Sequence, residues 1–188
     1  ALERCLEYAF TRGISTFIFL GDYVGELAYP ERTMQILYDL NNRYQCYFIM
    51  GNKEEYWLDY RANGEKGWKY KNSASGALLY AYDSFTDKDF EFFEQLKLAQ
   101  ELTIDKMPSV IICHGSPYKT NEKLLRDDVR TIDIMNRVNT SVILCGHTHV
   151  QQKIVHNEKC AFNPGSVGIP FLSEGKAQFL ILQGNDGM

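Results

Sequence analysis

The sequence Ser141-Val142-Ile143-Leu144-Cys145-Gly146-His147-Thr148-His149 joins a short apolar run to a loop that carries two histidines. The run is rich in β-branched and aliphatic residues, which is typical of a buried strand. In α/β proteins, functional side chains gather where such strands end. Because alternate residues of an extended segment point to the same side, His147 and His149 are expected to present both imidazoles to one volume. Such a pair is typical of metal ligands or proton carriers, and two surface histidines on a turn are the alternative.

Polar side chains also follow three other apolar runs, at the point where each run ends. These are Asp22 after residues 14–20, Asn52 after residues 46–50, and His114 after residues 110–113. A helical pattern at residues 30–43 separates the first two runs, and strand, helix and strand predict a βαβ unit with parallel strands. Because the carboxyl ends of parallel strands meet at one edge of a sheet, we expect these side chains to lie close to the two histidines.

The residue types at these strand ends indicate a metal site. One carboxylate, one amide oxygen and three imidazoles form a mixed oxygen and nitrogen set, which suits Mn, Fe or Zn better than Ca or Mg. Histidine and carboxylate ligands without cysteine favour an open catalytic site over a closed structural one. A purely structural role for the metals is the alternative.

The composition is that of a globular protein, with 188 residues of which 45% are hydrophobic and 23% charged. This length predicts a single domain over residues 1–188. No apolar run approaches the roughly 18 residues of a membrane helix, and the chain does not open with a secretion signal. We therefore expect a cytoplasmic protein without a membrane partner. Five cysteines without a C-x-x-C pair favour reduced thiols, in agreement with that location.

The formal net charge of −4 argues against duplex nucleic acid as a partner, because proteins bind the DNA backbone through excess positive charge. This charge does not exclude a small phosphorylated or nucleotide substrate, because bound divalent metals would reverse the local field. The composition leaves the oligomeric state open.

The remaining patterns predict elements around this site. An amphipathic helix over residues 1–12 has no capping residue before it, which indicates that an upstream segment is absent from the sequence. Residues 54–97 predict flanking helices rich in aromatics, whose rings form either a lid that stacks on a substrate or part of the core; core packing is favoured. Further predicted elements are an edge strand at 98–104, a helix at 132–138, and antiparallel strands at 152–156, 160–162 and 178–182.

Taken in order, the strand-end motifs resemble those of the calcineurin-like metallophosphoesterase superfamily. The matching segments are Gly21-Asp22, Gly51-Asn52, His114-Gly115 and Gly146-His147-Thr148-His149. The segments Gly21 to Gly25, His114 to Pro117 and Asn163 to Gly168 resemble its small single-domain branch of bacteria and archaea. The resemblance implies an α/β fold, a four-layer αββα sandwich, with a dinuclear metal site at the strand ends.

The resemblance also implies a role for each residue. Asp22 would bridge two metals. One of these metals would be completed by Asn52, His114 and His147, and the other would take His149. The catalytic residues implied for hydrolysis by a two-metal-activated hydroxide are Asp22, Asn52, His114 and His147. The metals would be divalent transition ions, with Mn favoured and Fe, Zn or Ni as alternatives.

Two departures from the family pattern stand out. The Asp-x-His motif that ends the family's first strand is missing, and with it go one strand of the sheet and two ligands of one metal. The family's Gly-Asn-His is Gly51-Asn52-Lys53 here. That histidine is often the proton donor to the leaving group, whereas a lysine of ordinary pKa is a poor acid at neutral pH. Lys53 would either hold the phosphate as a cation or point into solvent.

These features favour a metal-dependent phosphoesterase that acts on phosphomonoesters, phosphodiesters or nucleotides. A protein serine/threonine phosphatase, which acts on a phosphoprotein, is one alternative. A non-catalytic scaffold that keeps the fold and binds another protein is the second. The scaffold is disfavoured because Asp22, Asn52 and the three strand-end histidines are all present.

Overall fold

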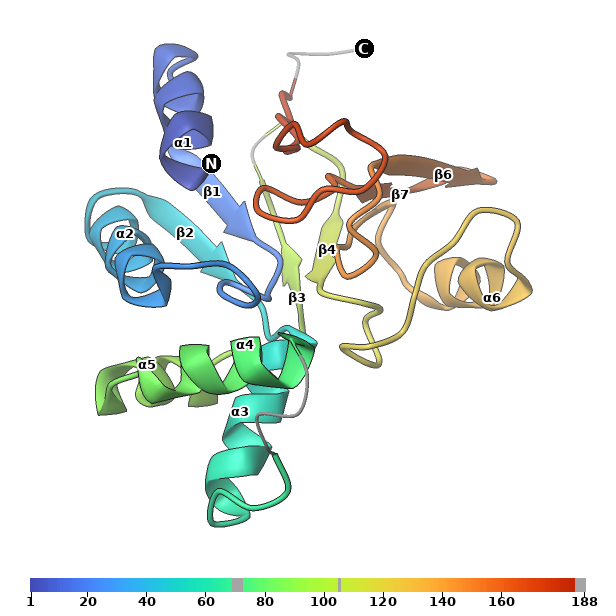
Figure 1. The fold of residues 1–188 in the computed structure, drawn as a ribbon. Helices are drawn as coiled ribbons and strands as arrows, with labels where there is room; N and C mark the ends of the chain where they lie inside the picture. Colours follow the sequence, from blue (N-terminus) through green and yellow to red (C-terminus); the bar gives the residue numbers. More distant parts are fainter. Residues whose placement is uncertain (69–72, 105, 185–188) are drawn as a thin grey trace.

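The computed structural model describes residues 1–68, 73–104 and 106–184, and these form a mixed α/β fold (Figure 1). The helices are α1 (Leu2–Thr11), α2 (Pro30–Arg43), α3 (Asn52–Ala62), α4 (Ser73–Asp83), α5 (Asp87–Glu94) and α6 (Val129–Arg137). The strands are β1 (Thr16–Phe19), β2 (Gln45–Phe48), β3 (Ala99–Leu102), β4 (Val110–Cys113), β5 (Val142–Leu144), β6 (Gln152–His156) and β7 (Lys159–Asn163).

The strands form two sheets. β1 and β2 pair in parallel, with Phe17 opposite Cys46, which confirms the predicted βαβ unit. The second sheet has the order β3-β4-β5-β7-β6. Its three inner strands are parallel, and the two outer strands are antiparallel to their neighbours. The edge position predicted for residues 98–104 is therefore confirmed for β3.

Alternate faces of the strands build the layers of the fold. On β4, Cys113 belongs to the same apolar cluster as Ile134 of α6. Its neighbour Ile112 faces the other way and belongs to a cluster that includes Ile18 of β1. Residues of α1 and α2 form a further cluster with β1. Helix, sheet, sheet and helix thus follow one another, in agreement with the expected αββα sandwich.

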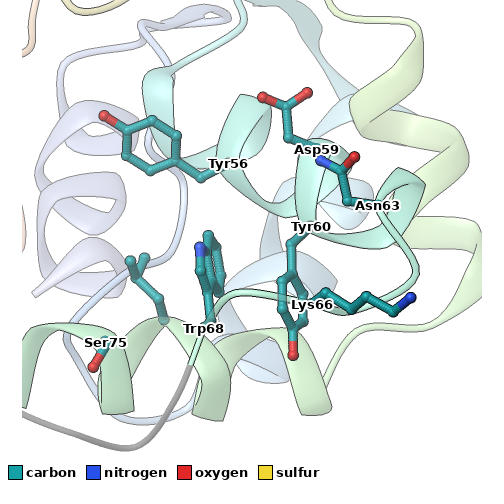
Figure 2. Close-up of a pocket in the computed structure, with 8 residues that line it drawn as sticks. Tyr56, Asp59, Tyr60, Asn63, Lys66, Trp68 and Ser75 are labelled. Atoms are coloured by element: carbon teal, nitrogen blue, oxygen red, sulfur yellow. The ribbon is translucent and has the colours of Figure 1, made fainter.

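The aromatic-rich segment contributes to the core, as the favoured interpretation predicted. Trp57 is fully buried, and its indole N–H donates to the carbonyl oxygen of Leu78 (3.0 Å). Tyr60 stacks on Trp68, with ring centroids 4.6 Å apart, beside a pocket that α3 and α4 line (Figure 2). Rings held in this way are not available as a lid over a substrate. Residues 69–72 of this segment lie outside the described residues.

Two predicted elements differ from the structure. The strand predicted at residues 178–182 is wrong: this segment is not in a strand, and Leu180 and Ile181 are each 39% exposed. Alternating apolar residues predict which face of a strand is buried, but they do not supply a neighbouring strand edge. Helix α6 begins at Val129, three residues before its predicted start, because the Asp128 carboxylate accepts the N–H of Arg130 and caps the helix.

Two predicted absences concern membranes and disulfides. No helix within the described ranges is long and apolar enough to cross a bilayer. The five cysteines are free thiols. Cys113 and Cys145 are buried among apolar side chains, which confirms that they pack in the core.

The loops after β1 and β2 approach each other so closely that both require glycine. Gly21 has a φ of 81°, and a Cβ there would lie 2.6 Å from Cα of Gly51. A Cβ on Gly51 would lie 2.5 Å from Oε2 of Glu54 and would also overlap Asp22. Gly51 itself has a φ of −92°, so lack of space and not backbone strain requires glycine at this position.

Replacing Gly51 by alanine is expected to lower the free energy of unfolding by about 1 to 3 kcal/mol, because the added methyl group must displace Asp22 and Glu54. Gly146→Ala is the matched control, since the nearest heavy atom to a Cβ there lies at 3.5 Å, an ordinary contact. Its free energy of unfolding is expected to change by less than about 0.5 kcal/mol. Urea denaturation measures both, and equal stabilities would contradict the close approach of the two loops.

Candidate metal centre

The predicted site residues lie where strands end. Asp22 follows β1, Asn52 opens α3 after β2, and His114 follows β4. His147 and His149 follow β5. Asp22 and the three histidines line one cavity of about 570 Å³, and the Asn52 side chain contacts His114. The structure thus brings together all five residues that the sequence predicted, three of them in close contact.

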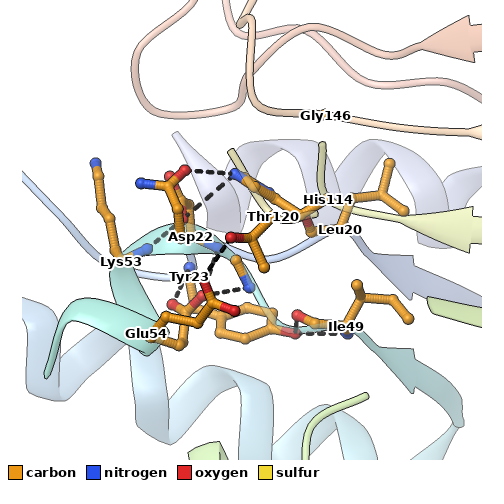
Figure 3. A network of polar contacts seen from close by, with 12 residues as sticks. Leu20, Asp22, Tyr23, Ile49, Lys53, Glu54, His114, Thr120 and Gly146 are labelled. Carbon is orange, nitrogen blue, oxygen red and sulfur yellow. Dashed lines mark hydrogen bonds and ion pairs between the residues drawn. The ribbon is translucent and has the colours of Figure 1, made fainter. Parts of the chain in front are cut away.

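The closest contacts join Asp22, Asn52 and His114. Nε2 of His114 lies 3.1 Å from Oδ1 of Asn52 and 3.5 Å from Oδ1 of Asp22, and Figure 3 shows His114 and Asp22 facing each other. Nδ1 of the same ring lies 2.5 Å from the carbonyl oxygen of Leu20. A carbonyl oxygen only accepts hydrogen bonds, so Nδ1 carries the proton and Nε2 is left to face Asp22 and Asn52.

This arrangement suits a divalent cation. If His114 is neutral, the lone pair of Nε2 and two side-chain oxygens converge without a proton between them. A cation among the three atoms would remove this repulsion, and an imidazole with two oxygen ligands suits a first-row transition metal. Within the described parts of the chain, no group of three or more His, Cys, Asp or Glu side chains is arranged to hold a metal ion. The group of three side chains in close contact therefore consists of His114, Asp22 and the amide oxygen of Asn52.

His147 and His149 reach the cavity by a different backbone path from the predicted one. Their φ values are 64° and 56°, so the segment is not extended and the argument from alternating strand residues was wrong. The ring centroids of His147 and His114 lie 5.2 Å apart. The ring of His149 lies 5.4 Å from that of Phe171, and its Nδ1 is buried with no hydrogen-bond partner among the described residues. The left-handed backbone conformation of these two residues thus places both rings on the cavity wall.

Burial is the main cause that lowers the pKa of both loop histidines. The second cause is an electrostatic interaction, with His114 at His147 and with Lys53 at His149. A lowered pKa favours the neutral imidazole, which is the form that binds a metal ion.

Asn163 holds the histidine loop in place, a role that the sequence did not predict. Its side-chain N–H₂ donates to the carbonyl oxygen of Gly146 (2.5 Å) and to the hydroxyl of Thr148 (3.0 Å). Its Oδ1 accepts the N–H of Gly165 (2.9 Å), and the residue is only 2% exposed. The Asn-Pro-Gly turn was the available signal, but its contact with a loop 15 residues away in sequence depends on the tertiary fold.

Glu54 joins the loops after β1 and β2, and the sequence did not predict this role either. Its buried carboxylate accepts the backbone N–H groups of Asp22 (2.9 Å), Tyr23 (3.0 Å) and Gly51 (2.9 Å). Burial and, after it, the negative charge of Asp22 raise the pKa of Glu54, while the three amide donors act in the opposite direction. The hydrogen bond from the Gly51 N–H to Glu54 caps the N-terminus of α3. A glutamate three residues after the capping position was the available signal for this bond in the sequence.

Lys53 does not point into solvent, so that alternative is wrong. Its side chain is 11% exposed, and Nζ lies 2.5 Å from Oε2 of Glu26. Its backbone N–H donates to Oδ1 of Asp22 (3.0 Å). Burial acts to raise the pKa of Glu26, but the hydrogen bond and charge of Lys53 prevail and lower it. A buried lysine, paired with an exposed carboxylate, therefore lies beside the candidate metal centre.

Substitution of Glu54 by glutamine is expected to lower the free energy of unfolding of the metal-free protein by about 1 to 3 kcal/mol. The reason is that the new N–H₂ group must face at least one backbone N–H that has lost its acceptor. Glu91→Gln on the exposed surface of α5 is the control and is expected to have little effect. Denaturation curves at pH 9, above the Glu54 pKa of about 8, compare the two, and equal midpoints would show that Glu54 does not hold the loops together.

The family of this chain is shown by comparison with known proteins. The calcineurin-like phosphoesterase superfamily domain matches residues 1–187. The uncharacterized protein MJ0912 of Methanocaldococcus jannaschii is 30% identical over 204 residues, and the match covers 99% of this chain and 78% of that protein.

Two solved structures share the fold. The hypothetical protein PH1004 from Pyrococcus horikoshii OT3 has a TM-score of 0.76 at 19% identity, covering 90% of this chain and 71% of that one. A metallophosphoesterase from Sphaerobacter thermophilus has a TM-score of 0.63 at 18% identity, covering 88% and 72%. At such identities the likeness shows the fold alone. The family match extends over nearly the whole sequence, and the chain belongs to the calcineurin-like phosphoesterase superfamily.

Proposed function

We propose that this protein is a metal-dependent phosphoesterase that hydrolyses phosphomonoesters, phosphodiesters or nucleotides. The observation that carries the proposal is that the side-chain oxygens of Asp22 and Asn52 lie within 3.5 Å of His114 Nε2, and that Asp22 and His114 line a cavity with His147 and His149. Membership of a phosphoesterase superfamily supports the same chemistry.

In this proposal Asp22, Asn52, His114 and His147 are the catalytic residues and hold one metal. Asp22 and His149 would hold a second metal. Mn is the metal that we expect, with Fe, Zn or Ni as alternatives, because the ligands are oxygen and imidazole nitrogen. When bound, divalent metals supply a nucleophilic hydroxide at neutral pH and neutralise charge on the phosphoryl group.

The protein's own contribution is to fix these side chains and to exclude water. His114 is 2% exposed, and the side chain of Asp22 is 9% exposed. Electrostatic attraction is stronger in such a water-poor site than in bulk solvent. The hydrogen bond between His114 and Leu20 sets the direction of the imidazole, and the amide donors to Glu54 set that of the Asp22 loop. The side chains are therefore oriented before a substrate binds.

The proposal places the enzyme in the cytoplasm, with a small phosphorylated or nucleotide substrate and no duplex nucleic acid as partner. The five free thiols support a reducing compartment, and the net charge of −4 supports the exclusion of duplex DNA. A phosphoprotein is the alternative substrate.

Asp22→Asn is the direct test of the proposed activity. The substrates are p-nitrophenyl phosphate and bis(p-nitrophenyl) phosphate, assayed with Mn²⁺. The substitution is expected to lower kcat/KM by about a thousandfold, because the loss of metal-based charge stabilisation is worth several kcal/mol. The change keeps the shape of the side chain, so the unfolding midpoint is expected to stay near that of the wild type.

Asp39→Asn, on the exposed surface of α2, is the matched control and is expected to retain full activity. Activity of Asp22→Asn equal to that of the wild type would rule out the proposed site. A wild-type protein that binds a partner protein but hydrolyses neither ester with any of the four metals would instead support the scaffold alternative.

A further inference from the structure

Lys53 and its ion-pair partner Glu26 line the cavity of the candidate metal centre, yet neither is among the proposed metal ligands. Lys53 is the second residue of α3 and follows Asn52 directly. In Figure 3 its side chain extends beside Asp22 and away from the helix. Lys53 and Glu26 line the same cavity as Asp22, His147 and His149. After burial, the charge of Lys53 is the next cause that lowers the pKa of His149, so the ammonium lies near a proposed metal ligand.

The local structure makes room for this charge. A Cβ on Gly25 would lie 3.3 Å from Cδ and 3.4 Å from Cε of Lys53 and would overlap the ammonium nitrogen. Glycine at position 25 therefore allows the lysine side chain to lie along the loop that follows β1. Burial of a lysine requires partial loss of its hydration and of its rotamer freedom, both of which a solvent-facing lysine would keep.

The ammonium group retains donors for a ligand. A lysine ammonium has three N–H donors. Among the described residues, the hydrogen bond of this group is to Glu26 Oε2 at 2.5 Å. The side chain of Glu26 is 41% exposed, whereas that of Lys53 is 11% exposed. The hydrogen bond to Glu26 leaves N–H donors of the ammonium for a phosphoryl oxygen in the cavity that Lys53 lines.

We propose that Lys53 binds a non-bridging oxygen of the substrate phosphoryl group and makes the site prefer phosphomonoesters to phosphodiesters. The inference rests on the proposed phosphoesterase function and narrows its substrate class. A phosphomonoester carries close to two negative charges at neutral pH, because its second pKa is about 6, whereas a diester carries one. The ammonium attracts a dianion more strongly than a monoanion. Glu26 positions the ammonium, and Gly25 provides the space for it.

The test is a comparison of binding and not of turnover alone. Dissociation constants for phenyl phosphate and diphenyl phosphate are measured by calorimetry on the Mn²⁺-loaded full chain at pH 7.5. The wild type is expected to bind the monoester more tightly. Lys53→Met, which has a similar shape and no charge, is expected to weaken monoester binding roughly tenfold to hundredfold, the loss typical of a hydrogen bond between charged groups. Diester binding is expected to weaken less, so the preference falls.

Three further variants isolate the charge as the cause. Lys53→Gln keeps a hydrogen-bond donor without the charge and is expected to lose the preference, whereas Lys53→Arg is expected to keep it. Lys176→Met is the matched control, because Lys176 also pairs with a carboxylate but its side chain is 80% exposed. Both dissociation constants are expected to stay unchanged in this control. Unfolding curves identify any variant that is not folded.

Each outcome decides the inference. Equal weakening of monoester and diester binding by Lys53→Met and Lys53→Gln, or no weakening, would overturn it, and so would a wild type that binds neither ester. Failure of the proposed function is distinct from these results. A wild type that hydrolyses neither ester but prefers phenyl phosphate through Lys53 would refute only the catalytic proposal. Hydrolysis with a preference that does not depend on Lys53 would refute only the present inference.

Discussion

The structure of the site depends on the hydrogen bonds that the buried Glu54 carboxylate accepts from the backbone. Three N–H groups, of Asp22, Tyr23 and Gly51, donate to it, and they belong to loops that follow two different strands. Buried amide groups without such an acceptor would each destabilise the fold. Glycine at positions 21 and 51 permits the close approach. This one carboxylate therefore sets where the Asp22 side chain stands relative to α3, and so relative to Asn52.

A second hydrogen bond joins the β1–β2 sheet to the larger sheet. His114 follows β4, but its ring hydrogen-bonds to the carbonyl oxygen of Leu20, which follows β1. The bond crosses from one sheet to the other, and it also fixes which imidazole nitrogen faces the carboxylate and the amide oxygen. In the loop after β5, the side-chain N–H₂ of Asn163 donates to Gly146 and Thr148 and so holds the backbone on either side of His147. The candidate centre is thus assembled from four strand ends, each held by a contact between distant parts of the chain.

These distant contacts mark the limit of what the sequence predicts. Apolar runs that end in polar residues were sufficient to predict the strand ends, the parallel strands and the five candidate residues that the structure brings together, because each signal is local. The left-handed backbone at His147 and His149, the role of Glu54 and the burial of Lys53 are set by neighbours that the sequence pattern does not reveal. Lys53, for example, is buried because Gly25 and Glu26, 27 residues or more before it, lie along its side chain. Residues 178–182 show the same limit, since alternation does not supply a partner strand.

The central claim is that the strand ends form a metal centre around His114. Anomalous diffraction from a crystal soaked in Mn²⁺ tests it most directly, because the signal locates the ion and not only its presence. The account predicts a peak at bonding distance from Nε2 of His114 and from the side-chain oxygens of Asp22 and Asn52. An Asp22→Asn crystal soaked in the same way is expected to show a weaker peak. A wild-type crystal without a peak at this position, or with its peaks elsewhere on the surface, would contradict the account.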